Sequence, residues 1–481
     1  MLIFEHSRPG RTAPTQFPAT VTEPLDIPER FLRKQSLNLP EVSEMQVVRH
    51  YTRLSQQNFS IDTHFYPLGS CTMKYNPKVC NRLAMLPALL AHHPATPASH
   101  SQSVLACLYD LQQILKEITG MHSISLAPAA GAQGEFAGVA MIRAYHEARQ
   151  DIARTEMLVP DAAHGTNPAS AVMCGYKVRE IPTLANGDVD IATLKNMVGV
   201  QTAGIMLTNP STLGIFERQI VEIAKIVHQA GGLLYYDGAN LNAILGKVRP
   251  GDMGFDVIHV NLHKTFATPH GGGGPGAGPV GVSERLQPFL PVPFVGYDGQ
   301  QYHWLTEREC PQTIGRLLAN AGNVGVLLRA YIYARLLGQD GMARVAEFSA
   351  LNANYLATKL AQAGFDLAFP QRRASHEFII SAKKQAKELG ITAMDIAKRL
   401  LDKGFHAPTT YFPLLISECL LIEPTETEDK QTLDNFVQAL QEILEEARTQ
   451  PDLVKNAPHT LPVKRLDDVK AAKDLNIVWH T

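Results

Sequence analysis

Residues 255–264 read FDVIHVNLHK, a short apolar run that ends in a histidine and a lysine. Four similar runs precede it along the chain: EMLVP (156–160), KVREIP (177–182), AGIMLTNP (203–210) and LLYYDGAN (233–240). Between the last two lies ERQIVEIAKIVHQAGG (217–232), whose apolar residues recur at helical spacing before a pair of glycines. Strands that alternate with helices in this way form a mostly parallel sheet, with ligands at the C-terminal ends of its strands. The chain is therefore predicted to contain an α/β domain.

The chain is predicted to have three parts. Residues 1–102 are rich in proline and polar residues and lack sustained periodicity, which favours an extended arm, with a disordered leader as the alternative. Residues 103–325 form the predicted large domain, which begins with a helix from Ser103 to Gly120. Residues 326–481 form a smaller C-terminal α/β domain with a polar tail. Helices are expected at 320–337, 341–363, 392–403 and 430–448, and strands in FDLAF, HEFIISA and CLLIEPT.

Charge and cysteine content exclude several classes of protein. The 481 residues include 44 lysines and arginines and 46 aspartates and glutamates, a formal net charge of −2, so no nucleic-acid partner is expected. Six cysteines are scattered without a C-x-x-C pair, and the first residues, MLIFEHSRPGR, do not resemble a secretory signal. We therefore expect a reducing, cytoplasmic environment.

Three further kinds of site are also not expected. The uncharged window 265–283 is filled with glycine and proline, so it does not predict a membrane span. The histidines form no H-E-x-x-H motif and no Cys/His quartet, so no metal is expected. Gly271, Gly273 and Gly276 match G-x-G-x-x-G, but they neither follow a strand nor open a helix, which argues against a dinucleotide site.

A lysine and an aspartate at neighbouring strand ends carry the predicted chemistry. Lys264 follows the run FDVIHV and is well placed to form a Schiff base as a nucleophilic amine, although a surface lysine at a strand end is the alternative. Asp237 ends the preceding run, where its carboxylate could keep a pyridinium nitrogen protonated, or could simply serve as a turn or cap residue. Together they predict pyridoxal 5′-phosphate (PLP) as the cofactor, with Ala239 beside Asp237 as a further contact.

The phosphate of such a cofactor needs a group of backbone N–H donors. The segment AAGAQGE (129–135) runs into a predicted helix, and its small residues let N–H groups approach an anion at the helix N-terminus. The predicted phosphate contacts are Gly131, Ala132 and Gln133.

Two more strand ends supply candidate contacts to the cofactor ring. His164 follows EMLVP and could stack on the ring, or could be a loop histidine bonded to backbone. Asn209 ends the next strand and could donate to the ring's phenolic oxygen, or could be a turn residue before proline. We also count His263 among the cofactor contacts and Thr166 among the substrate contacts.

Long segments of the chain match a known family. They are FYPLGSCTMKYNP (65–77), PAAGAQGE (128–135), HGTNPASA (164–171), LTNPSTLGIFE (207–217), YYDGANLNAI (235–244), residues 251–282, YFPLLI (411–416) and IEPTETE (422–428). Across nearly its whole length the chain resembles subunit 2 of the two-subunit glycine dehydrogenases (decarboxylating), the P-proteins of the glycine cleavage system. It matches the C-terminal half of the longer single-chain form.

The resemblance implies a PLP-dependent enzyme of fold type I in which Lys264 holds the cofactor. Such an enzyme decarboxylates glycine, releases CO2 and transfers the aminomethyl group to the lipoyl arm of the H-protein. The arm 1–102 would then line the active site and an interface, with Ser70, Cys71 and Thr72 shaping the glycine pocket, although Cys71 could equally be a small buried residue.

Partners and alternatives follow from the same resemblance. Two-subunit members pair with glycine dehydrogenase subunit 1, so an α2β2 heterotetramer is expected, together with the lipoylated H-protein. A PLP transaminase or lyase of the same fold would share the cofactor residues. A non-catalytic partner subunit is the third hypothesis, against which Lys264 and Asp237 argue.

Overall fold

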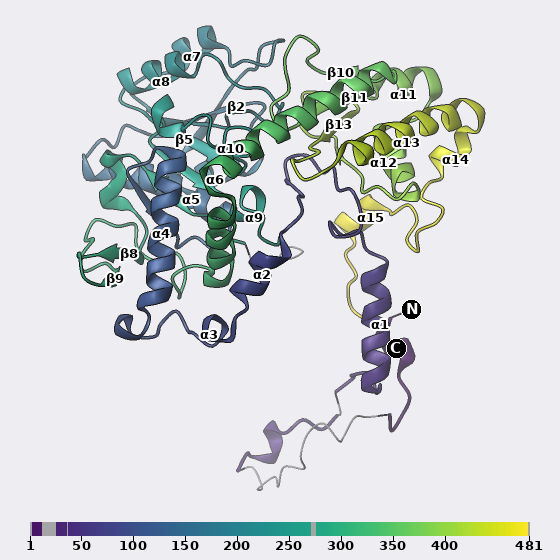
Figure 1. Cartoon of the computed structure of the whole chain (residues 1–481), viewed down its shortest axis with the longest axis horizontal. Coiled ribbons are helices and arrows are strands. Elements are labelled where there is room, and N and C mark those ends of the chain that lie inside the picture. Colours follow the sequence, from purple (N-terminus) through teal and green to yellow (C-terminus); the bar gives the residue numbers. More distant parts are fainter. Residues whose placement is uncertain (1, 12–25, 36, 271–275, 480–481) are drawn as a thin grey trace. The chain divides into compact units, whose positions relative to one another are not determined.

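The computed structural model describes residues 2–11, 26–35, 37–270 and 276–479 (Figure 1). Contacts divide the chain into two compact units, residues 1–60 with 461–463, and residues 61–460 with 464–481. The boundaries expected after residues 102 and 325 stay predictions. Gly271 and Gly273 of the G-x-G-x-x-G match lie outside the described residues.

The first unit contains a helix that the sequence analysis did not expect, α1 (Glu44–Gln56). It begins with a capping box in which the backbone N–H of Ser43 donates to Gln46 Oε1 at 3.0 Å and the backbone N–H of Gln46 donates to Ser43 Oγ at 3.4 Å. None of its residues is buried, although apolar residues recur along it at helical spacing: Met45, Val48, Tyr51 and Leu54 are all exposed. Two more unexpected helices, α2 (Lys78–Ala84) and α3 (Pro87–Leu90), belong to the second unit.

The large sheet of the second unit has seven strands in the order β1-β7-β6-β5-β4-β2-β3. Its strands are β1 (Ser123–Ser125), β2 (Glu156–Pro160), β3 (Lys177–Ile181), β4 (Thr202–Leu207), β5 (Leu233–Gly238), β6 (Val257–Val260) and β7 (Val280–Val282). The pairs from β3 to β6 are parallel, and β7 runs antiparallel to both of its neighbours. The five strands predicted from the apolar runs are confirmed.

Helices cover both faces of this sheet (Figure 1). They are α4 (Gln102–Thr119), α5 (Gly131–Ala148), α6 (Thr166–Met173), α7 (Ile191–Met197), α8 (Ile220–Gln229) and α9 (Leu262–Thr265). Because side chains alternate along a strand, Leu234 and Tyr236 of β5 pack with residues of α4 and α8, whereas Leu233 and Tyr235 pack with residues of α5. The sheet is therefore buried on both faces, as parallel sheets require.

A long helix, α10 (Val324–Gln362), leads from the large sheet to a smaller one. The two helices predicted here form one element that is broken at Gly338, where φ of 62° favours a residue without a side chain. Its first part contributes Val326 and Leu327 to the core beneath the large sheet. Its last part contributes Leu356 and Leu360 to the core of the small domain.

The small sheet is antiparallel, in the order β10-β11-β13-β12. Its strands are β10 (Asp366–Leu367), β11 (Phe378–Ser381), β12 (Thr409–Thr410) and β13 (Cys419–Ile422), and the helices that follow them are α11 (Lys383–Leu389), α12 (Ala393–Asp402) and α13 (Lys430–Thr449). Further elements are the hairpin β8 (Phe294–Tyr297) and β9 (Tyr302–Leu305), and the helices α14 (Pro451–Lys455) and α15 (Asp468–Lys473). Strands and helices predicted for this part are confirmed. Within the described ranges, no helix is both long and apolar enough to cross a bilayer.

A buried ion pair attaches the segment before α2 to both domains. Lys74 Nζ lies 2.7 Å from Glu426 Oε1, and the two side chains are 1% and 9% exposed. The same ammonium group donates to the hydroxyl of Tyr333 on α10 at 3.3 Å and to Asn242 Oδ1 at 3.4 Å. Burial opposes the charge of Lys74, but Glu426 and Tyr333 outweigh burial and raise the pKa of this lysine.

We predict that Lys74→Met lowers the free energy of unfolding by about 3–5 kcal/mol, because it leaves Glu426 as an unpaired buried charge. The shift in the midpoint of urea unfolding measures this loss. Lys78→Met is the matched control, since the pair of Lys78 with Asp62 is exposed and is expected to contribute at most about 1 kcal/mol. Equal shifts for the two variants would contradict the prediction.

Candidate active site

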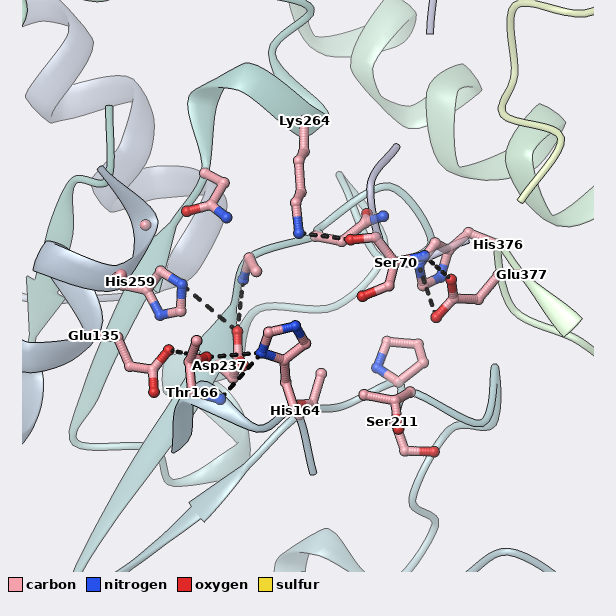
Figure 2. Close-up of a pocket in the computed structure, with 18 residues that line it drawn as sticks. Ser70, Glu135, His164, Thr166, Ser211, Asp237, His259, Lys264, His376 and Glu377 are labelled. Carbon is pink, nitrogen blue, oxygen red and sulfur yellow. Dashed lines mark hydrogen bonds and ion pairs between the residues drawn. The ribbon is translucent and has the colours of Figure 1, made fainter. Parts of the chain in front are cut away.

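A cavity of about 140 Å³ opens beside β5 and β6 (Figure 2). It is lined by Ser70, Gly131, Ala132, Glu135, His164, Thr166, Thr208, Pro210, Ser211, Thr212, Asp237, Ala239, Asn240, His259, Asn261, Lys264, His376 and Glu377. The lining thus brings together the segment before α2, the start of α5, the ends of several strands of the large sheet and the two residues before β11. Eight of the predicted site residues are among these side chains.

Lys264 reaches into the middle of this cavity (Figure 2). It lies on α9, a single helical turn that begins two residues after the end of β6, so the lysine follows its strand as the sequence predicted. Its Nζ donates a hydrogen bond to the backbone oxygen of Ser70 at 2.7 Å. The amine is therefore aimed by the segment before α2.

Asp237, at the end of β5, is 4% exposed and has three polar neighbours. Its Oδ2 accepts from Asn167 Nδ2 at 3.0 Å, and its Oδ1 accepts from the backbone N–H of Ala239 at 3.0 Å, with His259 Nε2 at 3.6 Å. Burial favours the neutral acid, but His259, the two hydrogen bonds and Lys264 together hold the pKa of Asp237 below its usual value. A buried carboxylate of this kind can bind a cationic nitrogen.

A second carboxyl group, Glu135, lies beside Asp237 and was not predicted. It accepts hydrogen bonds from Thr166 Oγ1 at 2.8 Å and from Asn167 Nδ2 at 3.0 Å. Burial and the charge of Asp237 raise the pKa of Glu135 to about 7. The two acids therefore differ in charge state at neutral pH, with Asp237 the more strongly ionised.

His164 stands at the edge of the same group. Its Nδ1 lies 2.8 Å from Thr166 Oγ1, and its ring meets the ring of Phe412 edge to face at 5.7 Å between centroids. Burial is the main cause that lowers the pKa of His164, so a neutral ring faces the cavity. A neutral flat ring suits stacking on another aromatic ring.

The start of α5 packs so closely on its neighbours that only small residues fit. A Cβ on Gly131 would lie 2.2 Å from Asn261 Oδ1, and one on Gly134 would lie 2.3 Å from the backbone oxygen of Gly278. Gly131 and Ala132 line the cavity at this helix N-terminus, where an anion is favoured. The side chain of Gln133 is used elsewhere, because it accepts from the backbone N–H of Ala129 at 2.7 Å and donates to the backbone oxygen of Leu317 at 2.9 Å.

Five predicted site residues lie outside the cavity lining: Cys71, Thr72, Gln133, Asn209 and His263. The amide of Asn209 pairs with the backbone of Glu217, accepting at 2.8 Å and donating at 3.3 Å, and it faces a neighbouring pocket. His263 lies against His270, with ring centroids 5.1 Å apart. Burial raises the pKa of the Cys71 thiol. The functional roles assigned to these residues stay predictions.

Several lining residues were missed by sequence reasoning. His259 interrupts the apolar run FDVIHV, and a polar residue inside a buried strand was a usable indication. His376 and Glu377 come from the small domain, more than a hundred residues after Lys264, and no local pattern marks them. Five more of the missed residues follow strands that were themselves predicted correctly. They are Thr208, Ser211, Thr212, Asn240 and Asn261.

The residues present fit PLP. Among the described residues, the buried Thr208 Oγ1 and Asn261 Oδ1 have no hydrogen-bond partner, although both residues line the cavity, as expected of a site for a polar ligand. Lys264 offers an amine for an aldehyde, Asp237 a carboxylate for a ring nitrogen, and the start of α5 backbone donors for a phosphate.

Comparison with known proteins assigns the family. Residues 345–459 match the model of the glycine dehydrogenase C-terminal domain, and residues 139–363 match that of class-V aminotransferases. Proteins named probable glycine dehydrogenase (decarboxylating) subunit 2 from Nitrosospira multiformis and Nitrosococcus oceani are 70% and 71% identical to this chain, over 100% of it and over 96% and 99% of their own lengths. The chain belongs to the glycine dehydrogenase (decarboxylating) subunit 2 family. The two family members named above align with this chain over its full length.

Solved structures agree with the fold of this subunit 2 family member. A glycine decarboxylase (P-protein) of the glycine cleavage system, in inhibitor-bound form, has a TM-score of 0.73 at 22% identity, covering 87% of this chain and 93% of that one. An alanine–glyoxylate aminotransferase from Nostoc has a TM-score of 0.59 at 16% identity, covering 82% and 98%. The predicted fold class, α/β of PLP-dependent fold type I with a mostly parallel large sheet, is confirmed.

Proposed function

We propose that this chain binds PLP at Lys264, decarboxylates glycine and transfers the remaining aminomethyl group to the lipoyl arm of an H-protein. The observation that carries the proposal is the cavity that holds the Lys264 amine and the Asp237 carboxylate together, in a chain of the subunit 2 family. The carboxylate of glycine leaves as CO2. The aminomethyl group bonds to one sulfur of the lipoyl disulfide, the S–S bond breaks, and the other sulfur becomes a thiol.

Four parts of the cavity lining have a task in this reaction. Once bound, PLP supplies an electron sink for the bond that breaks. Lys264 would hold the cofactor's aldehyde carbon and yield its place to the amine of glycine, while the backbone oxygen of Ser70 orients the freed Nζ. Asp237 would keep a proton on the ring nitrogen, and the start of α5 would bind the phosphate.

The walls also have to keep water and protons away until the acceptor arrives, because early protonation would release methylamine. Asp237, His259, His376 and Glu377 in these walls are each no more than 4% exposed. Buried polar groups of this kind hold the site in one geometry and leave little room for bulk water.

The relatives' names, which call them subunit 2, imply a partner subunit. We propose glycine dehydrogenase subunit 1 as its obligate partner, in an α2β2 heterotetramer, and the lipoylated H-protein as its acceptor. Co-purification with subunit 1 followed by sizing tests the assembly, and a stable, fully active monomer would contradict it. A cytoplasmic location stays a prediction.

The reaction itself is tested by the exchange of labelled CO2 with the carboxyl carbon of glycine. We expect the complex with subunit 1 to catalyse exchange rapidly only when lipoylated H-protein is present. H-protein without its lipoyl group is the control. Fast exchange without a lipoyl group, or transfer of the amino group to a 2-oxo acid, would favour the transaminase or lyase hypothesis, and failure to take up PLP would favour the non-catalytic one.

A further inference from the structure

His376 and Glu377 form the wall of the cavity on the other side of Lys264 from Asp237 (Figure 2). Glu423, which is not among the lining residues, belongs to the same cluster of side chains. One ligand atom from each of His376, Glu377 and Glu423 lies within 4.8 Å of those of the other two. All three are buried, with exposures of 4%, 3% and 0%. The proposed chemistry of Lys264 and Asp237 leaves this group without a task.

We propose that Glu377 and His376, with Ser70, form the subsite that receives the carboxylate group of the amino-acid substrate, with Glu377 as a hydrogen-bond donor. This inference rests on the proposed function. Glycine takes the place of the Lys264 amine, so its carboxylate must lie within a few ångströms of Nζ, and these three residues line the cavity there.

The wall is held in a fixed geometry. The backbone N–H of Ser70 donates to Glu377 Oε2 at 2.7 Å, which leaves Oε1 on the side of His376 Nε2, 3.8 Å away. That separation is too long for a hydrogen bond between the two groups, so each of them can form a hydrogen bond with a bound ligand. Oγ of Ser375 lies 3.2 Å from the other ring nitrogen of His376 and orients the ring.

The charge of the wall suits an anionic ligand only if Glu377 carries a proton. Burial, and then the neighbouring Glu423, raise the pKa of Glu377 well above its usual value, although Ser70 and Lys264 oppose the shift. Burial also raises the pKa of Glu423 to about 7, and together with Lys264 it lowers the pKa of His376 to about 3. A neutral acid and a neutral imidazole can both donate to a carboxylate.

Neutral donors also suit the departure of CO2. Hydrogen bonds between a carboxylate and neutral donors are weaker than those to a charged donor. The carboxylate is then oriented without a strong ion pair that would have to break as CO2 leaves. The subsite thereby favours loss of the carboxylate over its retention.

A divalent cation is the competing occupant of the three side chains. Two observations favour the carboxylate. One oxygen of Glu377 and both oxygens of Glu423 already accept from Ser70, Thr72 and Asn240, which leaves these oxygens fewer lone pairs for a metal. The amine of Lys264 also lies close enough to act on both acids, and its ammonium form would repel a cation.

The test compares glycine with methylamine, which lacks the carboxylate. Both are titrated into the PLP-loaded complex with subunit 1, and the change in cofactor absorbance gives each dissociation constant. For Glu377→Ala we expect binding of glycine to weaken at least about tenfold, while binding of methylamine changes less than about twofold. Glu377→Gln, whose amide still donates, should bind glycine within about threefold of the wild type.

Glu428→Gln is the matched control, because burial raises the pKa of Glu428 to about 7 but its side chain lies outside the cavity lining. Equal weakening of glycine and methylamine in Glu377→Ala would overturn the subsite, as would a loss in Glu377→Gln as large as in Glu377→Ala. One equivalent of tightly held Zn²⁺ or Mn²⁺ that Glu377→Gln lacks would overturn it in favour of a metal. No absorbance response of the wild type to glycine would overturn the proposed function as well, which separates the two failures.

Discussion

Lys264→Ala is expected to lower the rate of glycine–CO2 exchange by roughly 10³-fold or more, the scale on which removal of a covalent catalytic group acts. The amine that holds the cofactor would be gone, and with it the hydrogen bond to the backbone oxygen of Ser70. Borohydride reduction followed by peptide mapping reads the first step directly. The wild type should carry a pyridoxyl mass on Lys264, and the variant should carry none.

The matched control for this experiment is Lys247→Ala. Lys247 pairs with Glu347 on the surface, with both side chains about half exposed, and it lies outside the cavity lining. Its loss should leave both the labelling of Lys264 and the exchange rate unchanged. A pyridoxyl mass on another lysine of the wild type would contradict the assignment of Lys264.

Asp237→Asn is expected to lower the exchange rate by roughly 10²- to 10⁴-fold, the range observed for the loss of a positioned acid or base. The amide has nearly the shape of the carboxylate, but it carries no charge to keep the cofactor's ring nitrogen protonated. The PLP content and the midpoint of urea unfolding should change little. The exchange rate at saturating glycine is therefore the decisive measurement.

Glu135→Gln provides the comparison for Asp237→Asn. The pKa of Glu135 is raised to about 7, so this acid is already partly neutral at neutral pH, and the change to an amide alters the charge less. We expect a loss of less than about tenfold. A larger loss of exchange rate in Glu135→Gln than in Asp237→Asn would contradict this, because it would show that the essential negative charge is on Glu135 and not on Asp237.

The part of the site that could be predicted from the sequence lies at strand ends. Lys264 and Asp237 follow apolar runs that form adjacent parallel strands, and adjacent parallel strands end at one edge of a sheet. That the two side chains lie close together could therefore be predicted without knowledge of tertiary packing. The start of α5 was predictable for a similar reason, because small residues before an amphipathic helix indicate close backbone approach.

The part that could not be predicted depends on packing between distant segments. His376 and Glu377 reach the cavity because the small antiparallel sheet packs beside it, and their own neighbours in the sequence do not indicate this. Asn209 was predicted from its place at a strand end, but its amide found a local partner in the backbone of Glu217. In the first hundred residues, α1 was missed although its apolar residues recur at helical spacing, because this short pattern stands within a proline-rich, polar segment that otherwise lacks periodicity.

The loop at Ser70 and Thr72 connects this site to the order in which the chain folds. The backbone N–H of Ser70 bonds to Glu377, 307 residues away, and that of Thr72 bonds to Glu423, 351 residues away. Contacts so distant in sequence require the closure of very long loops, which costs entropy before any contact forms. The cavity wall formed by Ser70, His376 and Glu377 should therefore be among the last parts to assemble during refolding. Recovery of catalysis should lag behind recovery of helical content, and enzyme activity would then report the completion of folding.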